Sequence, residues 1–350
     1  MKHSIKFFAV LTALAFVTFS CKDDDDDIID ALPLGAYENG YFILNEGNST
    51  FTSPVTYVSE TGNVSQNIFS TENPNADPIG TYLQDMFFDD TRAFIISGSA
   101  NTVTVVNRYT FEYITTVSTD FQAPRYGTVV GGKAFVTNSA DWSTGTDDFV
   151  TVIDLSDYST SKIAIENNAE RILSEDGMVY IANGYYGSGN SITVLNPATN
   201  AVETIDLGNG NSPNFIEDEN GSLYVLTSNG KVIEINLSNN EIVSTIDLPA
   251  SIESPKNLDI EDNIAYFTSG SSVYGFALTA TTIPETPILT YESTSLYGIM
   301  YGFAVEDDKI YISDAGDFAS EGTVYEYTLN GTLLKNITTG IAPNSFHFND

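Results

Sequence analysis

A short apolar segment with an aromatic residue at its centre and a small polar residue at its end occurs seven times in the chain. One copy is residues 178–183, with Tyr180 at its centre. The central aromatic residues of the seven copies are Phe42, Phe94, Phe135, Tyr180, Tyr224, Tyr266 and Tyr311. By subtraction, successive copies lie 52, 41, 45, 44, 42 and 45 residues apart. A strand-rich repeat of this length indicates a radial β architecture.

Each repeat contains four short segments with period-two alternation, separated by turns rich in Asn, Gly and Pro. Residues 192–197 and 201–206 show the third and fourth segments of one repeat. Alternation together with many Val, Ile, Thr and Tyr residues is typical of antiparallel strands. No segment after residue 20 shows a convincing helical period. The sequence therefore predicts an all-β fold, a seven-bladed β-propeller with four antiparallel strands per blade.

The two ends of the repeat region complement each other. Residues 341–348 resemble the first strand of a repeat, but no aromatic strand follows them. Residues 40–45 form an aromatic strand that has no first strand before it. Pairing the two segments would complete the seventh blade and remove two exposed sheet edges. We therefore expect the N- and C-terminal strands to close the ring.

The first twenty residues predict a lipoprotein signal peptide. A short basic start is followed by an apolar stretch, residues 7–19, which is too short to span a bilayer comfortably. The end of this stretch and the residues after it, 18–21, resemble a bacterial lipobox, with Thr18 where Leu is commoner and with Cys21 as the lipidated residue. The alternative is an ordinary signal peptide with a Cys near its cleavage site. We favour lipidation, because the chain has no second Cys to pair with Cys21.

Lys22 and five Asp residues, 23–27, follow the Cys and indicate a solvated, disordered tether over residues 21–37. Directly after a lipidated Cys, this run also resembles the export signal that sends lipoproteins of Bacteroidota to the outer face of the outer membrane. The predicted organisation is a signal peptide (1–20), a lipidated tether (21–37) and one propeller domain (38–350). The expected location is the outer membrane, facing the cell exterior.

The chain resembles the YncE-like propellers of Bacteroidota in four features. These are the repeat period, the aromatic strand followed by Asn, residues 152–155, and residues 40–48 after a lipoprotein leader. Within that family the chain is most similar to the surface lipoproteins of the BtuG-type, corrinoid-binding group. The resemblance covers residues 38–350. It implies a corrinoid-like ligand and a TonB-dependent outer-membrane transporter as partner. The chain does not resemble the WD40 family, whose Trp-Asp and Gly-His pairs are absent.

Composition argues against several function classes. The chain has 47 acidic and 13 basic residues and a net charge of −34, so we expect no nucleic-acid partner and no attraction to an anionic membrane. Of its two His residues, His3 lies in the leader and His347 in the closing strand. Cys/His metal sites and a His-based triad are therefore excluded. We expect no enzyme activity, no cofactor and no metal. The alternative is a Ca²⁺ site formed by oxygen atoms of Asp314, Asp317 and Glu321, but their spacing is not that of an EF-hand, so we favour a solvated loop.

Two rings of polar residues are predicted around one end of the channel. The residues ten positions before the central aromatics, with the last one assigned by analogy, are Gln84, Arg125, Glu170, Asn214, Lys256, Tyr301 and Asn344. Their varied side chains suit an asymmetric polar ligand. The residues that end the aromatic strands are Asn45, Ser97, Asn138, Asn183, Thr227, Ser269 and Asp314. We interpret this second ring mainly as structural, because open strand ends need hydrogen-bond partners.

Long loops at the same end of the channel carry aromatic residues between Gly and Ser. The predicted ligand-binding aromatics are Tyr126, Trp142, Tyr185, Tyr186, Tyr301 and Phe318. Rigid rings on loops are common at recognition surfaces, although some of these rings are expected only to cover the blade tops. The leading hypothesis is a surface-anchored protein that captures a small molecule for a transporter. The alternatives are a protein-binding adhesion or assembly scaffold and, third, a propeller lyase.

Overall fold

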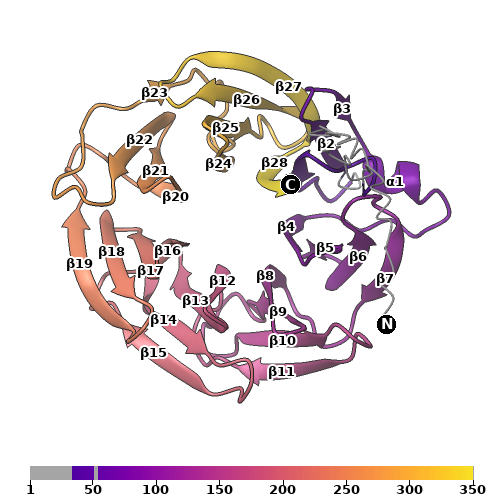
Figure 1. Ribbon diagram of the computed structural model, residues 1–350, viewed down its shortest axis with the longest axis horizontal. Coiled ribbons are helices and arrows are strands. Elements are labelled where there is room, and N and C mark those ends of the chain that lie inside the picture. The colour runs from indigo at the N-terminus through magenta and orange to yellow at the C-terminus, as the bar shows by residue number, and fades with distance from the viewer. Residues whose placement is uncertain (1–33, 51–53, 350) are drawn as a thin grey trace, which may run out of the picture. The chain divides into compact units, whose positions relative to one another are not determined.

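Seven four-stranded antiparallel sheets stand around a central channel in the computed structural model, which describes residues 34–50 and 54–349 (Figure 1). We number the sheets as blades one to seven in ring order, beginning with the blade that contains β1. The predicted signal peptide, Cys21 and most of the tether lie outside the described residues. In the described part of the chain, no helix is long and apolar enough to cross a membrane.

The first strand of every blade lines the channel, as the sequence predicts. From blade two to blade seven and then blade one, these inner strands are β4 (Leu83–Phe88), β8 (Pro124–Val130), β12 (Ile172–Glu175), β16 (Pro213–Glu219), β20 (Lys256–Glu261), β24 (Gly302–Glu306) and β28 (Pro343–Asn349). The aromatic strands come second and are β5 (Arg92–Ser97), β9 (Lys133–Asn138), β13 (Met178–Tyr185), β17 (Ser222–Thr227), β21 (Ile264–Ser269), β25 (Lys309–Asp314) and β1 (Gly40–Asn45).

The third and fourth strands complete each blade toward the outside of the ring. The third strands are β6 (Thr102–Asn107), β10 (Phe149–Asp154), β14 (Ser188–Leu195), β18 (Lys231–Asn236), β22 (Ser272–Ala277), β26 (Glu321–Thr328) and β2 (Val55–Ser59). The fourth strands are β7 (Tyr113–Val117), β11 (Thr160–Ala164), β15 (Val202–Asp206), β19 (Glu241–Asp247), β23 (Leu289–Thr290), β27 (Leu333–Ile341) and β3 (Val64–Ser65). Neighbouring strands are antiparallel throughout.

The repeated aromatic residues form the core between blades. All seven are buried, from Phe42 at 0% to Tyr224 at 9% exposure. Phe135 of blade three, for example, belongs to the same apolar cluster as Val179 and Ile181 of blade four. Burying one such side chain stabilises the fold by about 1.5–3 kcal/mol. The sequence repeat thus marks the contacts that hold adjacent sheets face to face.

The predicted closure of the ring is confirmed. β28 pairs with β1 in an antiparallel register that places His347 opposite Phe42 and Phe346 opposite Ile43. Blade one therefore combines the first three described strands with the last one, and the two ends of the domain meet there (Figure 1). Tyr37, which the sequence assigned to the tether, is buried beside Phe42 and belongs to this core.

One element was not predicted. A single helical turn, α1 (Ile68–Glu72), follows β3. Its residues Ile68 and Phe69 are buried in the cluster between blades one and two. A turn of five residues has no helical period to detect, and it forms here because its apolar side chains pack against the propeller.

Candidate functional site

Bulges place two consecutive side chains of an inner strand at one end of the channel. Pairing skips Gln84 in β4, Asn214 in β16, Asn257 in β20 and Asn344 in β28. In β8 two residues, 125 and 126, stand opposite one residue of β9. A bulge inserts an extra residue and re-aims its side chain, and bulges are frequent at rims and beside binding sites. The mouth of the channel is therefore lined more densely than simple alternation would allow.

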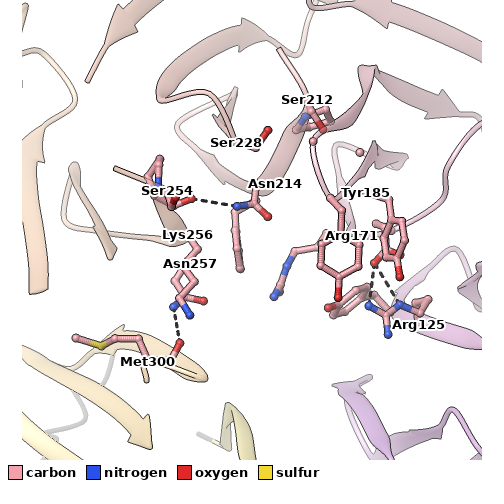
Figure 2. A pocket seen from close by; sticks show the side chains of 18 of the residues that line it. Arg125, Arg171, Tyr185, Ser212, Asn214, Ser228, Ser254, Lys256, Asn257 and Met300 are labelled. Atoms are coloured by element: carbon pink, nitrogen blue, oxygen red, sulfur yellow. Dashed lines mark hydrogen bonds and ion pairs between the residues drawn. The ribbon is translucent and has the colours of Figure 1, made fainter. Parts of the chain in front are cut away.

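A cavity of about 660 Å³ opens at this mouth, beside blades three to seven (Figure 2). We call it the mouth cavity. Its volume lies in the range of small-molecule pockets. It is lined by Arg125, Tyr126, Glu170, Arg171, Gly184, Tyr185, Tyr186, Gly187, Ser212, Pro213, Asn214, Phe215, Ser228, Ser254, Pro255, Lys256, Asn257, Met300 and Tyr301.

Three cationic side chains line the mouth cavity of this acidic protein. Arg125 donates hydrogen bonds to Glu170 from Nε and Nη2, at 3.2 and 3.1 Å, and another to Gln84. The Lys256 ammonium donates to a backbone carbonyl oxygen of the loop before β24, at 3.0 Å. Burial lowers the pKa of Lys256. Arg171 is different, because its guanidinium carbon lies 4.7 Å from the ring centre of Tyr126 and 3.9 Å from that of Phe215.

Three aromatic side chains, Trp142, Tyr185 and Tyr186, form a rim above the mouth cavity. The ring centres of Trp142 and Tyr185 are 5.5 Å apart, and those of Tyr185 and Tyr186 are 4.4 Å apart. Tyr186 is 93% exposed and Trp142 is 50% exposed. The Arg125 guanidinium lies 5.2 Å from the Trp142 ring centre and joins this rim to the cavity. The rim thus presents large apolar faces directly beside fixed cations.

The channel below the mouth cavity is lined by carboxyl groups. Burial raises the pKa of Asp85 to about 6 and that of Asp259 to about 7. Burial, and then the neighbouring Asp259, raise the pKa of Glu217. A second cavity, of about 210 Å³, is lined by Asp85 and Glu217 together with Tyr126 and Arg171, which also line the mouth cavity. Arg171 therefore stands where the two cavities adjoin.

The structure brings most of the predicted ligand-binding residues together. Eight of the twelve line the mouth cavity: Arg125, Tyr126, Glu170, Tyr185, Tyr186, Asn214, Lys256 and Tyr301. Trp142 lines an adjoining cavity of about 140 Å³, and Phe318 packs edge-on against Tyr301 with ring centres 5.0 Å apart. Gln84 and Asn344 do not line the mouth cavity.

The seven residues of the predicted first ring also connect the blades. Gln84 of blade two accepts from Arg125, which bonds to Glu170 of blade four. Asn214 and Lys256 donate to backbone carbonyls of the next blade at 3.1 and 3.0 Å. The remaining contacts are Tyr301 to Glu46 and Asn344 to the Leu83 carbonyl oxygen. Lys256 and Glu170 therefore do not pair with each other, since Glu170 is the partner of Arg125.

The second predicted ring has the structural role that the sequence suggested. Six of its members donate hydrogen bonds to nearby backbone carbonyl oxygens, for example Asn183 to Asn168 at 2.6 Å and Ser97 to Thr81 at 2.9 Å. The seventh, Asp314, accepts a hydrogen bond from the Tyr291 hydroxyl. Among the described residues, no group of three His, Cys, Asp or Glu side chains is arranged to hold a metal ion.

Sequence reasoning missed Arg171, Phe215, Asn257 and Met300. Three of them directly follow a predicted ring residue, and Met300 directly precedes one. The bulges and the bends before β12 and β24 let both members of each pair reach the cavity. Counting one residue per blade finds only one member of each pair. Arg171 carried one signal that was overlooked, since it is one of only four arginines in the chain.

Fold and site together define the class of protein, a seven-bladed β-propeller with a cation-lined cavity at one end of its channel. The chain belongs to the family described as "Domain of unknown function (DUF5074)", whose profile matches residues 39–341. The match takes in all seven blades and ends just before β28. A search of curated protein sequences gave no match.

Solved structures share the fold at low sequence identity. A functionally unknown protein from Desulfotomaculum acetoxidans is 12% identical, with a TM-score of 0.65 over 89% of this chain and 98% of that one. BamB from Moraxella catarrhalis is 15% identical, with a TM-score of 0.56 over 88% and 85%. A virginiamycin B lyase from Staphylococcus aureus is 14% identical, with a TM-score of 0.57 over 87% and 96%. These similarities establish the propeller and no more.

Proposed function

We propose that this protein binds a small molecule in the mouth cavity. The observation that carries the proposal is a cavity of about 660 Å³ that gathers three cations and an aromatic rim on a chain with a net charge of −34. Such a local excess of positive charge is not expected from the composition. Concave sites with aromatic walls and a few oriented polar groups are the usual form of ligand pockets.

In its finer form, the proposal is a surface-anchored binding protein that delivers its ligand to an outer-membrane transporter. The lipobox-like Cys21, the acidic run after it and the resemblance to BtuG-type propellers support this form. A corrinoid-like ligand is the first class to test. A corrinoid offers a flat ring system for the aromatic rim and polar substituents for the cations. A molecule of that size would fill the mouth cavity and rest on Trp142, Tyr185 and Tyr186.

A calorimetric screen tests this function. The purified protein is titrated with corrinoids, haem, siderophores and oligosaccharides, and one class is expected to bind with micromolar or lower Kd. Trp142→Ala and Tyr185→Ala should each weaken that ligand about tenfold, because a buried aromatic contact contributes on the order of 1–3 kcal/mol. The matched control is Tyr113→Ala, an exposed ring on the outer strand β7. Absence of any ligand, or equal effects at Tyr113, would refute the proposal.

The alternative function is binding of another protein. Leu296 and Tyr297, in the loop before β24, are 85% and 83% exposed. Isolated exposed apolar side chains are ordinary, but a pair on the face that carries the mouth cavity favours contact with a partner. Replacing both residues by Ser should abolish a protein complex and leave small-molecule binding unchanged. Loss of small-molecule binding in that variant would place the pair in the ligand site instead.

A further inference from the structure

The four arginines of the chain differ in how their guanidinium groups are satisfied. Arg92 bonds to Asp89 and to the Leu155 carbonyl oxygen. Arg108 bonds to Asn349 at 2.6 Å, and Arg125 bonds to Glu170. Within the described part of the chain, the Arg171 guanidinium makes no hydrogen bond and no ion pair, and its close contacts are with the rings of Tyr126 and Phe215. Arg171 is thus the exception among groups that ordinarily use their fixed fork of donors.

Two aromatic rings pack against the guanidinium group of Arg171. Its guanidinium carbon is 3.9 Å from the ring centre of Phe215, on β16, and 4.7 Å from that of Tyr126, on β8. Stacking on a ring satisfies the face of a guanidinium and leaves the N–H groups along its edge available. Figure 2 shows the Arg171 side chain extending into the cavity, between Arg125 on one wall and Asn257 on the other.

The positive charge of Arg171 is balanced by nearby carboxylates, although none of them is hydrogen-bonded to it. Its field acts on Asp85 and Glu217 in the channel below and favours their ionised forms. Neither carboxylate is hydrogen-bonded to Arg171. The arrangement therefore compensates the charge at a distance while the donors remain available on the cavity side. A bound anion would gain charge-assisted hydrogen bonds without breaking any that exist.

We propose that Arg171 is the anion anchor of the mouth cavity, and that the ligand carries a carboxylate or phosphate group attached to a flat ring system. The ring is placed by the aromatic rim of Trp142, Tyr185 and Tyr186, which adjoins the same cavity. This inference rests on the proposed binding function and narrows it to one chemical class. The other two cations already have partners within the protein. The Lys256 ammonium donates to a backbone carbonyl oxygen, and Arg125 is paired with Glu170, so both hold neighbouring blades together.

Four probes separate the charge of the ligand from its ring. Naphthyl phosphate and naphthoate carry both features, naphthol carries the ring alone, and inorganic phosphate carries the charge alone. By calorimetry, both ring-bearing anions should bind the full protein at least about tenfold more tightly than naphthol or phosphate, the ratio expected of a charge-assisted hydrogen bond. Trp142 is the single tryptophan of the chain, so quenching of its fluorescence locates the bound probe at the rim.

Two variants assign the preference to one side chain. Arg171→Gln should remove the advantage of the anions over naphthol, and Lys162→Gln should keep it. Lys162 is an exposed residue of β11, so its variant makes the same change in net charge away from the cavity. Thermal melts check that both variants fold. If Arg171→Gln does not fold, the unaltered protein still tests the ligand class, because equal binding of the charged and neutral probes overturns the inference. Arg171→Lys, which keeps the charge but lacks the planar fork of donors, then takes the place of the variant and should weaken the anions relative to naphthol.

The outcomes separate this inference from the proposed function. Equal binding of naphthol and the naphthyl anions, or a preference that survives Arg171→Gln, overturns the anion anchor and leaves the binding function standing. A neutral ligand from the broader screen, with no binding of the naphthyl anions, does the same. If no probe and no compound of the broader screen binds, both proposals fail together.

Discussion

At the scale of single residues, the carboxyl group of Asp85 shows how burial in the channel affects an acidic side chain. It lies on β4 and accepts a hydrogen bond from the Gly127 backbone N–H at 2.9 Å. Burial nevertheless raises its pKa to about 6, although that hydrogen bond and Arg171 both act to lower it. In the unfolded chain an Asp carboxyl titrates near pH 3.9. The folded protein thus holds this proton more tightly, and stability falls as pH rises from about 4 to about 6.

Asp85→Asn should therefore stabilise the protein at neutral and alkaline pH. The amide oxygen can still accept from Gly127, while the cost of ionisation is gone. At pH 8 we expect a gain of about 1–3 kcal/mol, since each pKa unit corresponds to about 1.4 kcal/mol. At pH 4 the two proteins should be equally stable. Urea unfolding at both pH values measures the difference. A variant that is less stable at pH 8 would contradict this account.

Residue positions at the mouth were predictable only in part. Counting back from Tyr180 or Tyr224 gave Glu170 and Asn214 correctly as mouth residues. The count assumes that one side chain per blade reaches the mouth, because side chains alternate along a regular strand. Bulges break that alternation and brought Phe215 and Asn257 into the cavity as well. Bulges depend on tertiary strain and twist, so the local sequence gave no indication of them.

At the scale of elements, the β13–β14 hairpin builds the rim. It is longer than most blade hairpins, and its two-residue turn, Tyr186–Gly187, has positive φ at both positions, 45° and 83°. Such a turn favours Asn-Gly, because a left-handed conformation costs a bulky residue about 1 kcal/mol. Gly184 lets the hairpin pass close to Pro213, since a Cβ there would overlap the Pro213 carbonyl oxygen. An exposed tyrosine at a strained position points to a role other than stability.

Tyr186→Asn should separate stability from binding. Asn tolerates the left-handed turn, so the melting temperature should stay the same or rise, with a gain of up to about 1 kcal/mol. Binding of naphthyl phosphate should weaken, because one ring of the rim is lost. Differential scanning calorimetry and titration calorimetry measure the two effects. A variant that binds as tightly as the unaltered protein would remove Tyr186 from the ligand site.

The elements themselves were largely predictable. The aromatic strands and their neighbours recur at one period seven times. A strand assignment that is ambiguous in one repeat is therefore settled by the other six. The helical turn α1 has no such repetition, and only its packing between blades one and two reveals it.

At the scale of the whole molecule, the ring depends on one pairing between distant strands. β28 is the inner strand of blade one, and it lies between β1 and the channel. Phe346 of β28 packs against Tyr41 and Tyr311, from blades one and seven. Without β28, an inner sheet edge and both neighbouring blade interfaces would be exposed. Closure therefore stabilises two interfaces in addition to its own hydrogen bonds.

Removing residues 343–350 should abolish the stable monomer. We expect aggregation or a broad, early melt by circular dichroism and size-exclusion chromatography, because the exposed β1 edge can pair with other chains. The matched control is Val64→Pro, which disrupts the outermost pairing of the same blade, Val58 with Val64, and should cost little. A synthetic peptide of residues 343–350 should restore part of the fold by strand addition. A truncated chain that melts like the full protein would contradict this expectation.

The closing pair also fixes when the molecule can finish folding. In the ladder of blade one, Gly40 stands opposite Asn349, so the earliest described strand waits for the last one. At about 5–20 residues per second, synthesis of the intervening chain takes roughly 15 to 60 seconds. During that interval β1 has an open inner edge. Only a chain translated through β28 can close the ring, so a chain that terminates before β28 keeps this inner edge open.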